Sequence, residues 1–185
     1  MKINFALFLC LLIIQQLRGQ ATQSFDLDLL LGKKEITAST KEFTLLPQVA
    51  LAFEKMEVAA KKDSVDLKVV SSYRSYNTQK SIWNRKYKRF ISEGLTGSEA
   101  IKKIVEYSTL PGTSRHHWGT DVDLIEENKK VEGDVLLEEH FHQGAYQKLH
   151  RWLQKNATRF GFEIVYTKDS SVSYTHLTLP TKLEV

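Results

Sequence analysis

The residues best suited to chemistry stand in the stretch "SRHHWGTDVDL", residues 114–124. If the residues from 119 onward form a strand, their side chains alternate between two faces. Val122 and Leu124 then share one face and point into a core, while Asp121 and Asp123 share the other face. Two neighbouring carboxylates repel each other unless a cation or hydrogen-bond donors lie between them. This pattern therefore predicts a partner for the two aspartates.

A histidine lies close enough in the sequence to be that partner. His116 precedes the strand on a loop, and Gly119 allows a sharp turn into the strand. A loop nitrogen and a strand carboxylate can reach one metal ion, and that pair of ligands suits zinc. Residue types alone are equally compatible with a solvated hairpin edge. Adjacent side chains diverge, so we expect His117 not to be a ligand and Trp118 to pack or to form a pocket wall.

Composition indicates an ordinary globular domain rather than a nucleic-acid-binding protein. The chain has 185 residues, of which 42% are hydrophobic and 26% charged, and its formal net charge is +4. This length allows one domain with a substantial core. The positive excess is too small to indicate nucleic-acid binding, so no nucleic-acid partner is expected.

The N-terminus has the layout of a secretory signal. Lys2 precedes the apolar run "INFALFLCLLII", and small residues follow at Gly19 and Ala21. We therefore expect residues 1–21 to be a signal peptide, with an anchoring or amphipathic helix as the alternative. The run is too short to span a bilayer comfortably, so no stable membrane span is expected after its removal. The expected location is secreted or periplasmic, in the cell envelope. The only cysteine, Cys10, lies inside the signal, which excludes disulfides and Cys-ligated zinc from the mature chain.

The remaining patterns mix helices and strands without a regular β-α alternation, which favours an α+β fold. Residues 22–42 are weakly patterned and are expected to form a loose lead-in segment. Apolar residues then recur at helical spacing from Leu46 to Ala60, with Thr44 as the expected cap and Pro47 in the first turn. Other helices are expected at 79–91, 98–107 and 145–160, and strands at 65–72, 120–125 and 161–166.

Three motifs resemble those of a known family. The pattern Ser-x-His-x-x-Gly-x-x-x-Asp in "SRHHWGTDVD" resembles the signature of the VanY-type zinc D-alanyl-D-alanine carboxypeptidases. "SSYRSYNTQ" resembles the family's other motif, an Arg after a strand with a Gln five residues later. "WLQKNATRFGFEIVY" resembles the helix and strand that follow its site. The motifs keep the family's order over residues 43–169, and they imply a small mixed antiparallel sheet with helices packed on one side, a scaffold shared with the hedgehog signalling domain.

The resemblance also implies a role for individual residues. His116 and Asp123 would be zinc ligands. Arg74 would face the substrate carbonyl or the developing oxyanion, where fixed positive charge stabilises negative charge. Gln79 and Ser114 would contact the substrate.

Asp121 has an expected supporting role, and three of the residues above have alternative roles. Asp121 stands where the family often has a small residue, and we expect it to orient His116 or a water. From residue types alone, Arg74 could instead form a surface ion pair. Gln79 could be an ordinary residue of a turn or of a first helical turn, and Ser114 could cap its loop.

The function implied by the resemblance is that of a secreted zinc metallopeptidase that removes terminal D-alanine from peptidoglycan stem peptides. A bound zinc ion lowers the pKa of its water to about 7, and a glutamate accepts the proton. The alternatives are a dipeptidase or endopeptidase acting on the same stem peptides, or a non-catalytic cell-wall-binding module. The sequence does not predict an oligomeric state.

The family's third zinc ligand and its general base belong to a Glu-x-Trp-His segment after the strand "GFEIVY". Here Ser173 and Thr175 stand where the Glu and the Trp would precede His176. The residues from Val172 to Leu177 match, one by one, a reading frame of the transposon end used in sequencing libraries.

We therefore expect residues 172–185 to be a translated sequencing adapter, with a natural divergent tail as the alternative. The peptidase domain, residues 43–171, would then be C-terminally incomplete, and the chain as given would be inactive. A tail of this origin should pack poorly and keep His176 away from His116 and Asp123.

Three other features are weaker. His140 and His142 are expected on a solvated loop or a pocket rim rather than as metal ligands, and His150 on the surface of a helix. The basic stretch of residues 84–90 is expected to be a solvated helix face, or a surface that attracts anionic cell-wall polymer.

Overall fold

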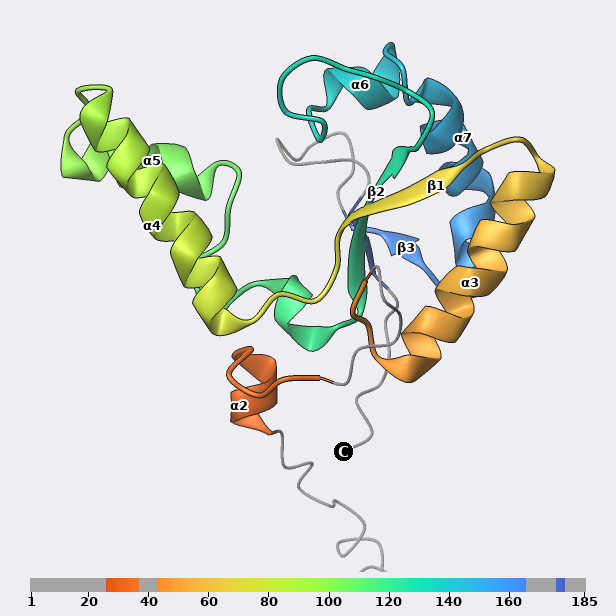
Figure 1. Cartoon of the computed structure of the whole chain (residues 1–185), viewed down its shortest axis with the longest axis horizontal. Helices are drawn as coiled ribbons and strands as arrows, with labels where there is room; N and C mark the ends of the chain where they lie inside the picture. Colours follow the sequence, from red (N-terminus) through yellow and green to blue (C-terminus); the bar gives the residue numbers. More distant parts are fainter. Residues whose placement is uncertain (1–25, 37–42, 166–175, 179–185) are drawn as a thin grey trace, which may run out of the picture.

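A computed structural model of the chain describes residues 26–36, 43–165 and 176–178 (Figure 1). The signal peptide expected at residues 1–21 lies outside these ranges. None of the helices in the described ranges is long and apolar enough to cross a membrane. The elements are α2 (Leu27–Leu30), α3 (Pro47–Lys62), β1 (Leu67–Ser71), α4 (Tyr76–Ser92), α5 (Gly97–Val105), η1 (Arg115–Trp118), β2 (Asp121–Glu126), α6 (Glu139–His142), α7 (Gln147–Asn156), η2 (Ala157–Phe160), β3 (Glu163–Ile164) and β4 (His176–Thr178).

The four strands form one sheet in the order β1-β2-β4-β3, and every neighbouring pair is antiparallel. The inner strand β2 is buried along its whole length. Val122 and Leu124 are fully buried in the core, as the alternation predicts. The structure confirms the expected α+β fold with a small antiparallel sheet.

Helices α3 and α7 bury their apolar faces in the same core as the sheet. Helix α3 begins at Pro47, because a proline lacks the N–H that the first turn leaves unpaired. Its N-cap is Leu46, so the prediction that Thr44 caps the helix is wrong. The buried face of α3 has the spacing that the sequence shows: Val49, Ala50, Phe53, Met56 and Ala60.

Helices α4 and α5 form a separate arm with its own small apolar cluster (Figure 1). Helix α4 begins at Tyr76, three residues earlier than the motif predicts, because the Ser75 hydroxyl caps it by accepting from the Thr78 N–H. Helix α5 opens with a capping box between Thr96 and Glu99. The arm places the first turns of α4 directly after strand β1.

The segment before α3 packs against this junction. The backbone N–H of Tyr76, at the start of α4, donates to the Gly32 carbonyl at 2.7 Å, and the Tyr73 hydroxyl donates to the Lys34 carbonyl at 3.0 Å. Helix N-termini need such acceptors, because their first N–H groups have no partner within the helix. The prediction of a loose lead-in is therefore wrong for residues 26–36.

Part of the tail also belongs to the sheet. Strand β4 lies between β2 and β3, with the backbone of residue 176 opposite Asp123 and Leu177 opposite Val122. Leu177 is fully buried, so the expectation of a poorly packed tail is wrong for residues 176–178. The expectation that residue 176 lies away from Asp123 is wrong for its backbone, because the two residues are directly paired between β4 and β2. Residues 172–175 and 179–185, and the side chain of His176, lie outside what the structure describes.

Candidate active site

His116 and Asp123 meet at the edge between η1 and β2. Gly119 ends η1 with a φ of 67°, a left-handed conformation that turns the chain into β2. The turn brings the Nε2 atom of His116 to 3.1 Å from the Oδ2 atom of Asp123. Both residues are buried, with 5% and 6% of their surface exposed. The structure thus brings together the two residues that the sequence predicts as metal ligands.

The spacing of these two atoms fits two ligands of a single zinc ion. Ligands held about 2.0–2.2 Å from a tetrahedral ion lie about 3.3–3.6 Å from each other, slightly more than the 3.1 Å between these two atoms. An imidazole nitrogen and a carboxylate oxygen are also the donor types that zinc accepts. In the described part of the chain, no group of three or more His, Cys, Asp or Glu side chains is arranged to hold a metal.

Asp121 has partners of its own. Its Oδ1 atom accepts from Arg115 Nε at 3.0 Å, and its Oδ2 atom accepts from the Thr120 hydroxyl at 2.6 Å. The carboxylate is fully buried, so these donors offset the cost of burying its charge. Each aspartate thus has its own partner, which offsets the expected repulsion between them: Arg115 and Thr120 for Asp121, and His116 for Asp123. An orienting role of Asp121 toward His116 stays a prediction.

Arg74 follows β1, and an irregularity near the end of this strand helps to position it. Val69 pairs with Leu124 and Ser71 pairs with Asp123, so Val70 is the extra residue of a β-bulge. The bulge turns Ser71 toward the site, where its hydroxyl accepts from Arg74 Nη2 at 2.6 Å. Burial lowers the pKa of the Arg74 guanidinium below its ordinary value, and the nearby charge of Asp123 opposes that shift.

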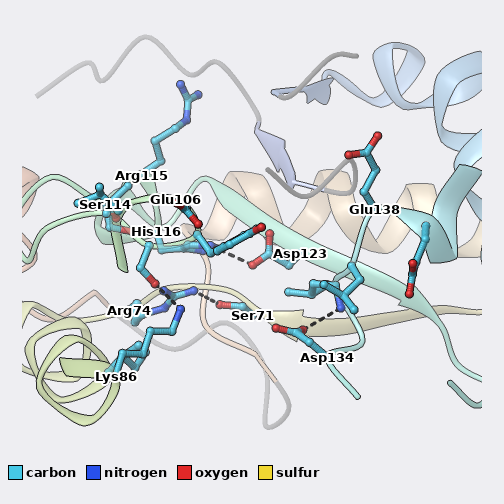
Figure 2. A pocket seen from close by; sticks show the side chains of 18 of the residues that line it. Ser71, Arg74, Lys86, Glu106, Ser114, Arg115, His116, Asp123, Asp134 and Glu138 are labelled. Carbon is cyan, nitrogen blue, oxygen red and sulfur yellow. Dashed lines mark hydrogen bonds and ion pairs between the residues drawn. The ribbon is translucent and has the colours of Figure 1, made fainter. Parts of the chain in front are cut away.

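Gln79 and Ser114 hold different places around Arg74. Gln79 is fully buried: its carbonyl oxygen accepts from Arg74 Nη1 at 2.7 Å, and its amide donates to the Thr109 carbonyl at 2.7 Å. It lies behind Arg74, whereas Ser114 lines the same cavity as Arg74, His116 and Asp123. Figure 2 shows Arg74, His116 and Asp123 close together; they come from the segment between β1 and α4, from η1 and from β2, respectively.

His117 is part of the scaffold. Its Nε2 atom accepts from the Gly112 N–H at 3.0 Å, so its Nδ1 atom carries the proton and donates to the Arg74 carbonyl. Burial lowers the pKa of this imidazole. Both ring nitrogens are used, which agrees with the prediction that His117 is not a ligand. The Arg74 N–H in turn donates to the His116 carbonyl at 3.0 Å, so the two motifs are tied together through the backbone.

The cavity has a volume of about 950 Å³, and several of its lining residues were not predicted from the sequence. Lys86 comes from the basic stretch that was expected to be solvated. Helical spacing was a usable signal, since Gln79, Ile82 and Lys86 follow one another on one face of α4. The others lie on loops and on α6, where no periodic pattern indicates their direction: Glu106, Asp134, Glu138 and Glu139.

The structure confirms the expected position of His142 on α6 but not that of His150 on α7. His142 lines the cavity, which confirms its expected place at a pocket rim. His150 is buried, with 6% of its surface exposed, so the prediction that it lies on the surface is wrong. Its ring packs edge-on against that of His142, with the ring centres 5.1 Å apart, because α7 lies against α6.

Comparison with known sequences finds matches over most of the chain. The family profile described as "VanY: D-alanyl-D-alanine carboxypeptidase" matches residues 42–177. The chain is 35% identical over 122 residues to YodJ of Bacillus subtilis, which is named as a carboxypeptidase. It is 29% identical over 113 residues to a D-alanyl-D-alanine carboxypeptidase of Enterococcus faecalis. These matches cover 66% and 61% of this chain, but the chain spans only 39% and 37% of those relatives.

Solved structures with the same fold include two of VanY and one of LdcB. The vancomycin-resistance D,D-pentapeptidase VanY, determined with Zn(II), has a TM-score of 0.61 and 24% identity, covering 78% of each chain. VanYB in complex with D-Ala-D-Ala has a TM-score of 0.63 and 22% identity, covering 86% of this chain and 80% of that one. The LD-carboxypeptidase LdcB has a TM-score of 0.58 and 26% identity, covering 78% and 63%. With the fold, the ordered motifs and a family profile that spans most of its length, the chain belongs to the VanY family of D-alanyl-D-alanine carboxypeptidases.

Proposed function

We propose that this chain is the core of a zinc-dependent peptidase that removes terminal D-alanine from peptidoglycan stem peptides. One observation carries the proposal: the His116 and Asp123 donor atoms lie 3.1 Å apart in a cavity that Arg74 and Ser114 also line. Membership of the VanY family and the likeness to a structure determined with Zn(II) support it.

In this proposal each site residue has a distinct task. His116 and Asp123 hold the zinc ion, which when bound supplies a water that is acidic near neutral pH. Arg74 is held in place by Ser71 and Gln79. Its remaining N–H groups point donors at the substrate carbonyl, where negative charge develops during peptide cleavage. The Ser114 hydroxyl contacts the bound peptide.

The cell envelope is the proposed site of action, because the stem peptides lie outside the cytoplasm and residues 1–21 have the layout of a secretory signal. A second candidate function is binding of the same peptides without cleavage. A dipeptidase or endopeptidase activity on the same peptides would use the same residues.

We also propose that residues 172–185 replace the segment that carries the third ligand and the base, so that the chain as given binds zinc weakly and does not turn over substrate. The test replaces these residues with a segment containing Glu-x-Trp-His. A matched control has the same replacement with Gln in place of that Glu, which keeps the ligand and removes the base. Zinc content is measured by atomic absorption, and D-alanine release from a stem pentapeptide by chromatography.

The replaced chain should bind zinc and release D-alanine, the Gln control should bind zinc without release, and the chain as given should do neither well. D-alanine release by the chain as given, or loss of zinc on changing His176→Ala in it, would show that the tail is functional as it stands. A replaced chain that binds zinc and peptide but releases nothing would favour the binding module.

A further inference from the structure

Lys86 is a cationic residue that the three family-like motifs do not include. It lies on the inner face of α4 and lines the cavity beside Arg74. Figure 2 shows the two side chains together on one side of the cavity, with Asp134 and Glu138 farther along it. Two positive side chains adjacent in a partly closed site repel each other. The charges of Asp134 and Asp123 offset part of this repulsion, and a bound anion would offset more of it.

The described part of the protein provides a hydrogen-bond acceptor for only one of the N–H donors of Lys86. Its Nζ atom donates to the Ser108 hydroxyl at 2.6 Å, and an ammonium group has three N–H donors. In the described ranges, Lys86 forms neither a second hydrogen bond nor an ion pair. Burial lowers the pKa of Lys86, and the nearby charge of Asp134 offsets that shift only in part. Ser108 therefore holds the ammonium at the wall of the cavity, and its other N–H donors bond no atom of the described part of the chain.

The anion that fits is a carboxylate one residue beyond the cleaved bond. In a peptide, the carbon of the C-terminal carboxylate lies about 3–4 Å from the carbon of the preceding carbonyl, by standard bond lengths. If Arg74 meets that carbonyl, the terminal carboxylate falls among its immediate neighbours. Lys86 is the cationic side chain beside Arg74 in Figure 2, whereas Arg115, which also lines the cavity, donates to Asp121. A peptide that continues past this point offers a neutral carbonyl, which forms a weaker hydrogen bond than a carboxylate does.

We propose that Lys86 is a specificity-determining residue that binds the terminal carboxylate of the leaving D-alanine, and so favours cleavage at a free C-terminus over internal cleavage. This inference rests on the proposed peptidase function and names the residue that would separate carboxypeptidase from endopeptidase activity. A purely structural role, holding the loop of Ser108 onto α4, is the competing explanation.

The experiment compares two ligands that differ only at the C-terminus: acetyl-L-Lys-D-Ala-D-Ala and the same peptide with a C-terminal amide. The full chain, supplied with zinc, is titrated with each peptide by calorimetry, and chromatography of the same samples checks that the peptides stay intact. The variants are Lys86→Met, which keeps the length and removes the charge, and Lys88→Met as a matched control, since Lys88 is exposed on the same helix. The amide peptide serves as an internal check of folding, because it reaches the same cavity without the negative charge.

The wild-type chain should bind the acid more tightly than the amide. Lys86→Met should weaken acid binding by about 10- to 100-fold, as expected for one charge-assisted hydrogen bond, and leave amide binding unchanged. Lys88→Met should change neither. The proposal is overturned if Lys86→Met weakens both peptides equally, which indicates the structural role, or if it leaves the acid preference intact. If the wild-type chain binds the peptides without preferring the acid, Lys86 loses this role while the proposed function stands; if it binds neither peptide, both fall.

Discussion

Replacing the buried Gln79 tests whether this residue supports Arg74 or contacts the substrate. Gln79→Met keeps the approximate volume but removes both side-chain hydrogen bonds, each 2.7 Å long. A net contribution of about 1 kcal/mol for the neutral bond to Thr109, and about 1.5–3 kcal/mol for the bond to charged Arg74, sums to about 2.5–4 kcal/mol. Arg74 lines the cavity and Thr109 is exposed, so water can restore part of this loss. We expect a net destabilisation of about 2 kcal/mol.

Chemical denaturation of the metal-free chain measures this change, and a thermal scan should show a fall of about 4–8 °C in melting temperature. Gln48→Met is the matched control, because Gln48 is exposed on α3 and should change stability by less than about 0.5 kcal/mol. Peptide binding should weaken as well, since Arg74 loses one of the two side chains that orient it. Unchanged stability combined with lost peptide binding would refute the supporting role and favour direct contact between Gln79 and the substrate.

Three further changes test the rest of the site. In the chain carrying Glu-x-Trp-His, Asp123→Ala should abolish zinc binding and Asp121→Ala should weaken zinc affinity or activity by about 10- to 100-fold; equal and complete zinc loss from both would contradict their assignments. Arg74→Lys keeps the charge but cannot span Ser71 and Gln79, so turnover should drop sharply at normal zinc content, and lost zinc would argue against its role at the carbonyl. Burial, reinforced by His142, lowers the pKa of His150, so the unfolded chain takes up this proton more readily than the folded one. The stability that the neutral His150 side chain contributes is complete above about pH 6.5 and is lost as the pH falls below that value. The denaturation midpoint of His150→Gln should therefore depend less on pH below about pH 6.5 than that of the wild-type chain. An unchanged pH dependence would refute the argument.

Periodicity predicts the parts of this fold whose burial repeats regularly. The apolar spacing of α3 and the alternation of Val122 and Leu124 identify buried faces, because one covered side demands one repeating pattern. The position of His150 was not predictable in the same way. It stands beside the exposed Arg151, and only the packing of α6 against α7 buries it.

The site itself was predictable where its residues follow one another along the chain. His116 and Asp123 belong to one stretch, and a single glycine turn brings them together. Contacts between distant segments were not predictable. The bulge at Val70, which turns Ser71 toward Arg74, depends on how β1 pairs with β2 rather than on any local motif. The hydrogen bond from Gln79 to Thr109 likewise depends on how the arm folds back.

Strand β4 shows that joining a sheet and supplying chemistry are separate requirements. Backbone hydrogen bonds hold a strand between two neighbours with little regard to its side chains, and one buried leucine is enough to fill the core position opposite Val122. Three residues of almost any short apolar segment could meet that requirement, so the packing of β4 does not decide the origin of the tail. Catalysis also requires a general base, here a carboxylate that can accept a proton near neutral pH. Position 173 holds a serine, whose hydroxyl is far too weak a base at that pH without a partner to activate it. Even if position 176, whose backbone lies opposite Asp123, supplied a ligand, zinc binding would not by itself bring turnover. The glutamine control in the tail replacement separates these two requirements.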